Sequence, residues 1–185
     1  MQTLPIDRSL PARDRILATA SRLFYQEGLR ATGIDRIIAE SGVAKMSFYR
    51  HFPSKTDLIR AFLEARHRAW MGWFAEAVER RLDSQGFAAL AGVLGEWFAQ
   101  PDFRGCAFIN TVAETGRDFP SAIEHKRELA AFVEALAQRL QLPSPSQIAA
   151  KAMIVIEGMI VRAQMGETAG LEEIASQMLA EISRA

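Results

Sequence analysis

Apolar residues recur at intervals of three and four positions along nearly the whole chain, a pattern typical of amphipathic helices. The face of the first such segment is formed by Ile16, Leu17, Ala20, Leu23 and Phe24. Gly28 follows these residues and is a natural helix stop. The alternation of apolar and polar positions that marks half-buried strands is missing from the sequence. The pattern therefore predicts an all-α protein.

Two shorter helices are expected directly after the first. Thr32, followed three positions later by Asp35, matches a capping box that starts a helix ending at about Ser41. Gly42 permits a tight turn, and the next helix is expected from about Lys45 to His51. The two helices and their turn predict a helix-turn-helix near the N-terminus.

A longer helix is expected after this motif. Pro53 closes the third helix, and Ser54 with Asp57 three positions later forms a second capping box. Beyond it, long amphipathic segments are separated by fewer breaks, at Gly86 and in residues 100–105, 116–120, 142–146 and 166–170. We therefore expect a three-helix bundle over residues 1–53 and a larger helical domain over residues 54–185.

Composition and charge change this picture in one respect. With 49% hydrophobic and 24% charged residues, the chain has the composition of a globular protein and not of a disordered or fibrous one. Its formal net charge is zero, yet residues 1–68 hold 12 Lys and Arg against 7 Asp and Glu. A basic N-terminal part suits phosphate binding, because neutralised phosphates release condensed counterions. The same imbalance is compatible with a chance distribution of charge.

Hydroxyl and cationic side chains gather in the third helix and just after it. They are Lys45, Ser47, Tyr49, Arg50, His51 and Lys55. A helix with such a surface fits a DNA major groove about 12 Å wide, where Lys and Arg contact phosphates or guanine edges and hydroxyls donate to phosphate oxygens. The spacing alone also fits the solvated face of a helical hairpin, since glycine turns between helices are common.

The stretch from Thr32 to Leu63 resembles the signature of the TetR/AcrR family of repressors. It has the sequence T-G-I-D-R-I-I-A-E-S-G-V-A-K-M-S-F-Y-R-H-F-P-S-K-T-D-L-I-R-A-F-L, and its distinctive part is Y-R-H-F-x-S-K. Together with the first helix, the resemblance covers residues 13–63. It implies a homodimer whose paired recognition helices bind palindromic double-stranded operator DNA. It also implies that residues 1–53 form the DNA-binding domain and that residues 54–185 bind a small-molecule inducer and dimerise.

The resemblance also implies a set of DNA-binding residues. They are Thr32, Lys45, Met46, Ser47, Tyr49, Arg50, His51 and Lys55. Thr32 is expected to touch a phosphate at the start of the second helix. The sequence departs from the family pattern at Gly33, where Thr is common, and at Met46, where a small residue or Pro is usual. The first change removes a phosphate contact, and the second favours apolar contact with a thymine methyl group.

Aromatic residues are frequent in the middle of the chain. The expected ligand-binding residues are Trp70, Trp73, Phe74, Trp97 and Phe108, with Asn110, Thr111 and Glu114 as polar groups that orient a ligand. Packing of the aromatic residues in a core, and capping or solvation of the polar ones, are the alternative interpretations. The segment from Gly105 to Asn110 is similar to a G-C-x-x-x-N stretch in one branch of the family, which identifies no ligand.

The last two helical segments carry broad apolar stripes. The expected dimer interface consists of Ile148, Ala152, Ile156, Met159, Ile160, Leu171, Ile174 and Met178. In the resembling family, two such helices from each subunit form a four-helix bundle. A monomer that buries the same stripes internally is the alternative.

Several functions are disfavoured by the residues present. Cys106 is the only cysteine, which excludes an intrachain disulfide and favours an inert core residue over a redox switch. His51, His67 and His125 are scattered, so neither a metal site nor a catalytic cluster is expected, and no cofactor is required. The segment from Met1 to Pro11 has no apolar core of a signal peptide, and no membrane span is present, so we expect a cytoplasmic protein.

The sequence thus favours a ligand-responsive transcriptional repressor, released from DNA by a small apolar or aromatic inducer. Two alternatives remain open at this point. One is a DNA-binding protein of the same fold that senses no ligand. The other is a helical small-molecule carrier or enzyme whose basic N-terminus is incidental.

Overall fold

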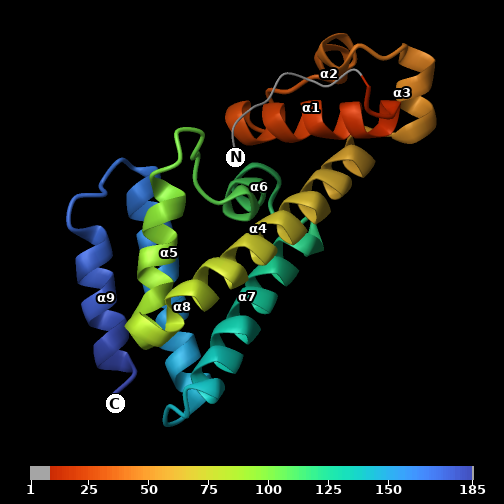
Figure 1. The fold of residues 1–185 in the computed structure, drawn as a ribbon. Helices are drawn as coiled ribbons and strands as arrows, with labels where there is room; N and C mark the ends of the chain where they lie inside the picture. The colour runs from red at the N-terminus through yellow and green to blue at the C-terminus, as the bar shows by residue number, and fades with distance from the viewer. Residues whose placement is uncertain (1–8, 185) are drawn as a thin grey trace. The chain divides into compact units, whose positions relative to one another are not determined.

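The computed structural model describes residues 9–184, and these residues form helices without strands (Figure 1). In chain order the elements are α1 (Ala12–Glu27), α2 (Ile34–Ser41), α3 (Lys45–His51), α4 (Lys55–Gln85), the 3₁₀ turn η1 (Gly86–Ala88), α5 (Ala89–Phe98), α6 (Ala107–Thr115), α7 (Pro120–Arg139), α8 (Pro145–Gln164) and α9 (Leu171–Ile182). The predicted all-α fold is confirmed. The sequence analysis expected no signal peptide in the segment from Met1 to Pro11. Most of this segment, residues 1–8, lies outside the described residues.

The chain divides into two compact units. The first contains the chain up to Arg68 together with Cys106–Ile123, and the second contains Ala69–Gly105 and the chain from Glu124 onward. The first half of α4 and all of α6 therefore belong to the unit that holds α1, α2 and α3. The expected division of function at residue 53 stays a prediction.

The first unit is built around side chains that point inward from its N-terminal helices. Ile16 and Leu23 of α1, Ile37 of α2 and Phe48 of α3 have no exposed surface. Gly42 ends α2 in the left-handed conformation, at φ 64° and ψ 33°, which costs glycine little. This turn lets α3 leave α2 at an angle and brings Phe48 into the same core.

Charged side chains join α1 to α2. Arg36 of α2 donates from Nη2 to Oε1 of Glu27 at 2.8 Å and from Nε to Oε1 of Glu40 at 2.7 Å. Glu40 also pairs with Arg22 of α1. The hydrogen bond from Arg36, followed by the one from Arg22, lowers the pKa of Glu40 below its ordinary value. The network contributes modestly to stability, because its side chains are partly exposed.

The second unit has its core where α5, α8 and α9 pack side by side (Figure 1). Leu90 and Leu94 of α5, Ile156 of α8 and Leu179 of α9 have no exposed surface. Burying four such side chains contributes roughly 1.5–3 kcal/mol each. This packing decides which faces of α8 and α9 remain outside.

The outer faces of α8 and α9 differ from the expected dimer interface. Six of the eight expected residues lie inside the protomer: Ile148, Ala152, Ile156, Met159, Ile160 and Leu171. They are buried because the wider apolar stripe of each helix packs against the rest of its own subunit. The apolar side chains left exposed are Ile154, Val161 and Met165 of the α8 region together with Ile174 and Met178 of α9. We call these five residues the α8–α9 apolar face.

The sequence also predicted that no membrane span is present. In the part of the chain that the structure describes, no helix combines the length and the apolar character that crossing a bilayer requires.

Candidate nucleic-acid interface and ligand-binding residues

The third helix is held in place by its inner side. Phe48 is fully buried, Phe52 directly after the helix is 3% exposed, and Val43 in the turn is 9% exposed. The guanidinium of Arg13 lies 5.3 Å from the centre of the Phe52 ring, which adds a cation–π contact from α1. These contacts fix the backbone of α3, so the directions of its outer side chains are also fixed.

The outer side of α3 presents polar and apolar groups to solvent. Met46 is 83% exposed and Tyr49 is 40% exposed, and Lys45 and Arg50 are also exposed. Nζ of Lys45 lies 3.6 Å from Oδ1 of Asp35, but both side chains are largely in water. Such a pair is worth little, so the ammonium group remains available to a phosphate.

The remaining expected residues of this surface are less exposed. Ser47, His51 and Lys55 are half-buried. Burial lowers the pKa of Lys55, and the negative charge of Glu114 acts in the opposite direction. A phosphate placed beside Lys55 would act in the same sense as Glu114 and favour the charged ammonium.

The start of α4 is fixed by the capping box expected at Ser54. The backbone N–H of Asp57 donates to Oγ of Ser54 at 3.1 Å, and this hydroxyl donates to Oδ2 of Asp57 at 2.6 Å. This prediction is confirmed. It places Lys55 in the first turn of a helix that begins directly after the helix-turn-helix.

The structure corrects the expectation for Thr32. Its side chain is fully buried, and its hydroxyl donates to the carbonyl oxygen of Gly28 at 2.8 Å. The expected capping box with Asp35 is also absent, because Gly33 is the N-cap of α2 and no side chain caps that end. The Thr32 hydroxyl closes the loop between α1 and α2 and is not on the outer surface with α3.

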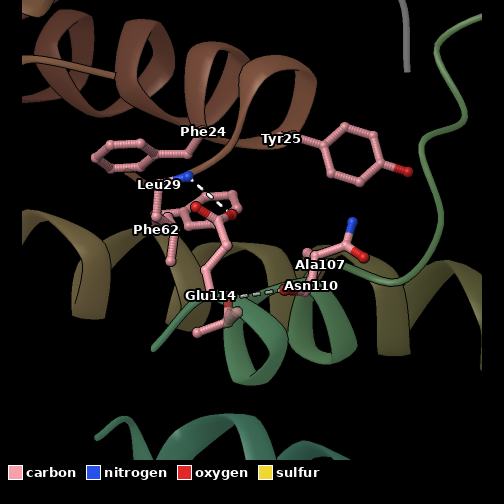
Figure 2. A pocket seen from close by; sticks show the side chains of 8 residues that line it. Phe24, Tyr25, Leu29, Phe62, Ala107, Asn110 and Glu114 are labelled. Atoms are coloured by element: carbon pink, nitrogen blue, oxygen red, sulfur yellow. Dashed lines mark hydrogen bonds between the residues drawn. The ribbon is translucent and has the colours of Figure 1, made fainter. Parts of the chain in front are cut away.

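Three of the expected ligand-binding residues line a pocket in the first unit. Its walls are Phe24, Tyr25, Leu29, Phe62, Ala107, Asn110, Thr111 and Glu114 (Figure 2). The empty volume is about 200 Å³, including the part open to solvent. The space inside it that a water-sized sphere can occupy is only about 10 Å³, roughly enough for one water molecule and far below the 300–1,000 Å³ typical of pockets for drug-sized ligands.

The polar groups of this pocket bind protein atoms. The Glu114 carboxylate accepts from the backbone N–H of Leu29 at 3.0 Å and of Arg30 at 2.8 Å, and Figure 2 shows it directed at Leu29. Thr111 is buried and its hydroxyl donates to the Ala107 carbonyl at 2.7 Å. Glu114 therefore ties α6 to the loop before α2. Nothing in the sequence indicated this contact, because its partners lie 85 and 84 positions away.

The other expected ligand residues separate into two groups. Phe108 of α6 lies in the first unit, with its ring centre 6.5 Å from that of His67. Trp70, Trp73, Phe74 and Trp97 lie in the second unit. The expected set is thus shared between the two units, and its role in ligand binding stays a prediction.

The aromatic group of the second unit is centred on Trp70. This indole stacks on Phe74 at 4.7 Å between ring centres and meets Trp97 at 5.3 Å and His125 at 5.4 Å in edge contacts. Trp70 is 8% exposed, and its buried Nε1 has no hydrogen-bond partner. Sequence reasoning selected Trp70, Phe74 and Trp97 but not His125, which lies on α7 and is recognisable only by its burial.

Metal-ligating and thiol groups are not organised into a site in the described part of the chain. Within residues 9–184, no group of three His, Cys, Asp or Glu side chains could hold a metal ion. Cys106 is a buried free thiol.

Two helices joined by a glycine turn, with a buried inner face and an exposed cationic and hydroxyl-bearing outer face, define a helix-turn-helix DNA-binding protein. Residues 16–62 match the family model described as bacterial regulatory proteins, tetR family. The matched segment contains most of α1, all of α2 and α3 and the start of α4.

Similar proteins are regulators of this kind. The chain is 28% identical over 181 residues to the HTH-type transcriptional repressor ComR of Escherichia coli (strain K12), covering 88% of this chain and 83% of ComR. It is 51% identical over 43 residues to the uncharacterized HTH-type transcriptional regulator YxaF of Bacillus subtilis (strain 168), which is 23% of this chain and 22% of YxaF. The first curated relatives are therefore matched over only about a fifth of their length.

A solved structure extends the similarity over the whole fold. A TetR-family transcriptional regulator from Streptomyces coelicolor superposes with a TM-score of 0.79 at 29% identity, covering 92% of this chain and 93% of that one. Residues 16–62 thus match the DNA-binding segment of the tetR family, and the whole chain resembles a TetR-family transcriptional regulator in fold and sequence.

Proposed function

We propose that this chain is a ligand-responsive repressor that binds palindromic operator DNA in the cytoplasm as a homodimer and is released by a small apolar or aromatic inducer. The observation that carries the DNA-binding part is the outer face of α3. Lys45, Tyr49 and Arg50 are exposed there on a helix whose backbone is fixed by the buried Phe48. A rigid helix with cations and a hydroxyl on one side is suited to the major groove.

The proposed contacts divide between bases and phosphates. Lys45, Met46, Ser47 and Arg50 face the groove, and Tyr49, His51 and Lys55 bind phosphates. Thr32 is left out of this set because its hydroxyl is buried. Phosphate contacts position the helix, and base contacts select the sequence.

The proposed partner in the homodimer is a second copy held through the α8–α9 apolar face. Ile154 is 75% exposed, Met165 is 73% exposed and Ile174 is 57% exposed. Large apolar side chains that cluster on a surface mark interaction sites. Two helices from each copy would form a four-helix bundle, and a twofold dimer presents its two recognition helices to half-sites about 34–36 Å apart.

The proposed inducer binds in the second unit near Trp70. An unsatisfied buried N–H is costly, and an acceptor on a ligand would satisfy it. The surrounding rings of Trp73, Phe74 and Trp97 favour a flat apolar or aromatic molecule. Trp70 lies on α4, the helix that begins at Lys55, so a ligand that displaces α4 would change the separation of the two recognition helices.

The test of the proposal is binding to a DNA duplex selected from a random library by the protein itself. We expect Tyr49→Phe, Arg50→Ala, His51→Ala and Lys55→Ala to weaken binding while the dimer stays intact in sedimentation measurements. Arg80→Ala is the matched control for Arg50→Ala, because both arginines are exposed and Arg80 lies on α4, outside the helix-turn-helix.

The outcomes separate the alternatives. Unchanged binding in all of these variants contradicts the site assignment, and failure of the wild-type protein to select any duplex contradicts the function. A selected duplex that is not released by any member of a panel of aromatic compounds favours a regulator that senses no ligand. A protein that binds such compounds but no DNA is a carrier or an enzyme.

A further inference from the structure

Met46 is unusual among the apolar side chains of the protein. At 83% it has the highest exposed fraction of any large apolar side chain in residues 9–184. It stands in the first turn of α3, between Lys45 and Ser47. The other highly exposed examples, Ile154 and Met165, belong to the α8–α9 apolar face, whereas Met46 lies in a polar neighbourhood.

Folding gives no reason for a long apolar side chain at this position. The core of the helix-turn-helix is supplied from the opposite side of α3 by Phe48, with Phe52 just beyond the helix. A side chain that is four-fifths in water contributes little burial to folding. The exposed apolar side chain of Met46 is therefore better explained by contact with a binding partner than by folding.

The neighbours of Met46 define what it faces in a complex. Tyr49 and Arg50 follow it by three and four positions, which places all three on one side of the helix. Lys45 precedes it and is exposed. In the proposed complex with DNA, cationic and hydroxyl groups on both sides would bind phosphates or base edges, which would leave the Met46 side chain to face the floor of the groove between them.

The floor of the major groove offers few groups that a thioether can bind. Guanine, adenine and cytosine present hydrogen-bond donors and acceptors there, and thymine adds the C5-methyl group. Methionine has no donor and only a weak acceptor, and its unbranched chain is long, flexible and polarisable. The thymine methyl is the group on the base edges that matches it.

We propose that Met46 selects a thymine in each half-site of the operator through contact with the thymine C5-methyl group. This inference rests on the proposed DNA-binding function and adds a residue that determines sequence specificity. It predicts that the preference at this base pair depends on one methyl group and not on a hydrogen bond.

The experiment removes only that methyl group. A duplex selected from a random library by the wild-type protein is remade with each thymine in turn replaced by deoxyuridine, which keeps every donor and acceptor of the base edge. Burial of one methyl group corresponds to roughly a fourfold change in affinity. We therefore expect one deoxyuridine position in each half-site to weaken wild-type binding about fourfold, with the other positions nearly neutral.

Variants of Met46 assign the effect to its side chain. In Met46→Ala and in Met46→Gln the thymine and deoxyuridine duplexes should bind equally well at that position. Both substitutions are at an exposed site, so the fold is retained, and thermal unfolding checks this. Lys55→Ala is the control, because loss of its proposed phosphate contact should weaken binding to every duplex and keep the fourfold difference between thymine and deoxyuridine.

Failure of this inference is distinguishable from failure of the function. If the protein selects a duplex but no thymine methyl affects binding, or if the deoxyuridine effect persists in Met46→Ala, the inference is overturned and the DNA-binding function stands. If the wild-type protein selects no duplex, the proposed function and the inference fall together.

Discussion

Glu114 offers the sharpest test of how the first unit is held together. Its carboxylate accepts from the backbone N–H groups of Leu29 and Arg30, at 3.0 and 2.8 Å, in the loop that leads from α1 into α2. Replacing it by alanine leaves both donors without this partner. The loop also places Gly28 at φ +93°, a backbone conformation that favours glycine.

The size of the effect follows from the two bonds. A hydrogen bond to a charged group contributes about 1.5–3 kcal/mol when shielded from water, and an exposed one contributes less because water replaces it. The bond from Leu29 is partly buried and the bond from Arg30 is exposed. We expect Glu114→Ala to lower the free energy of unfolding by about 2–3 kcal/mol, or the melting temperature by roughly 5–10 °C.

Glu114→Gln removes only one of the two hydrogen-bond acceptors. The glutamine amide keeps one oxygen acceptor but turns its NH₂ group toward the second backbone donor. We therefore expect Glu114→Gln to lower the free energy of unfolding by about half or more of the loss expected for Glu114→Ala. Urea denaturation measures the free energy, and hydrogen exchange at the amides of Leu29 and Arg30 measures the bonds directly. Glu76→Gln, an exposed glutamate on α4, is the control. Unchanged stability with full protection of both amides in Glu114→Ala would refute the reasoning.

Two further predictions concern the α1–α2 ion network and the α8–α9 apolar face. Arg36 and Arg22 lower the pKa of Glu40 below its ordinary value of 4.5. The ion pairs of Glu40 therefore stabilise the fold at pH values above 4.5, and this stabilisation is lost as the pH falls through the lowered pKa. At pH 7 the free energy of unfolding from urea denaturation should therefore be higher in wild type than in Glu40→Gln, by less than about 1 kcal/mol, and this difference should disappear in acid. A difference that grows below pH 4 contradicts this. If the proposed homodimer forms through the α8–α9 apolar face, Ile154→Asp should shift the protein from dimer to monomer in sedimentation, whereas Lys151→Ala on the same helix should leave the dimer intact. A dimer that persists in Ile154→Asp contradicts this interface.

Helix order and the helix-turn-helix could be predicted from sequence because their signals are local. The third helix was expected from Lys45 to His51 and has those bounds, since Gly42 before it and Pro53 after it fix both ends within a few residues. The cap at Ser54 likewise depends on a residue three positions away. The exposed side of α3 could also be predicted, because the apolar Phe48 must face the core and the opposite side of this short helix then faces solvent.

The errors of the sequence prediction concern contacts between distant segments. On α8 both the inner and the outer side carry apolar residues, and the choice between Ile156 and Ile154 depends on where α5 and α9 pack. The sequence pattern predicted that Thr32 caps α2, but its hydroxyl donates to the carbonyl oxygen of Gly28 and closes the loop before that helix. The ligand-binding set includes Trp70 of the second unit and Glu114 of the first, and it stays a prediction. No local pattern contains this information.

We expect the position of α3 to depend on Glu114, which lies on α6, outside the helix-turn-helix. Glu114 holds the loop before α2, α2 shares the core of α3 through Ile37 and Phe48, and α3 carries the proposed DNA contacts. Loosening this loop should therefore weaken operator binding even though no phosphate contact is lost.

Salt dependence distinguishes this indirect effect from a direct one. The slope of log affinity against log salt concentration counts the phosphates that are neutralised. Glu114→Gln should weaken binding to the selected duplex with an unchanged slope, because it misplaces the helix without removing a cation. Lys45→Ala, if Lys45 binds a phosphate, should reduce the slope by about 1. A reduced slope in Glu114→Gln would mean that Glu114 positions a cation such as Lys55 and does not act through the α1–α2 loop.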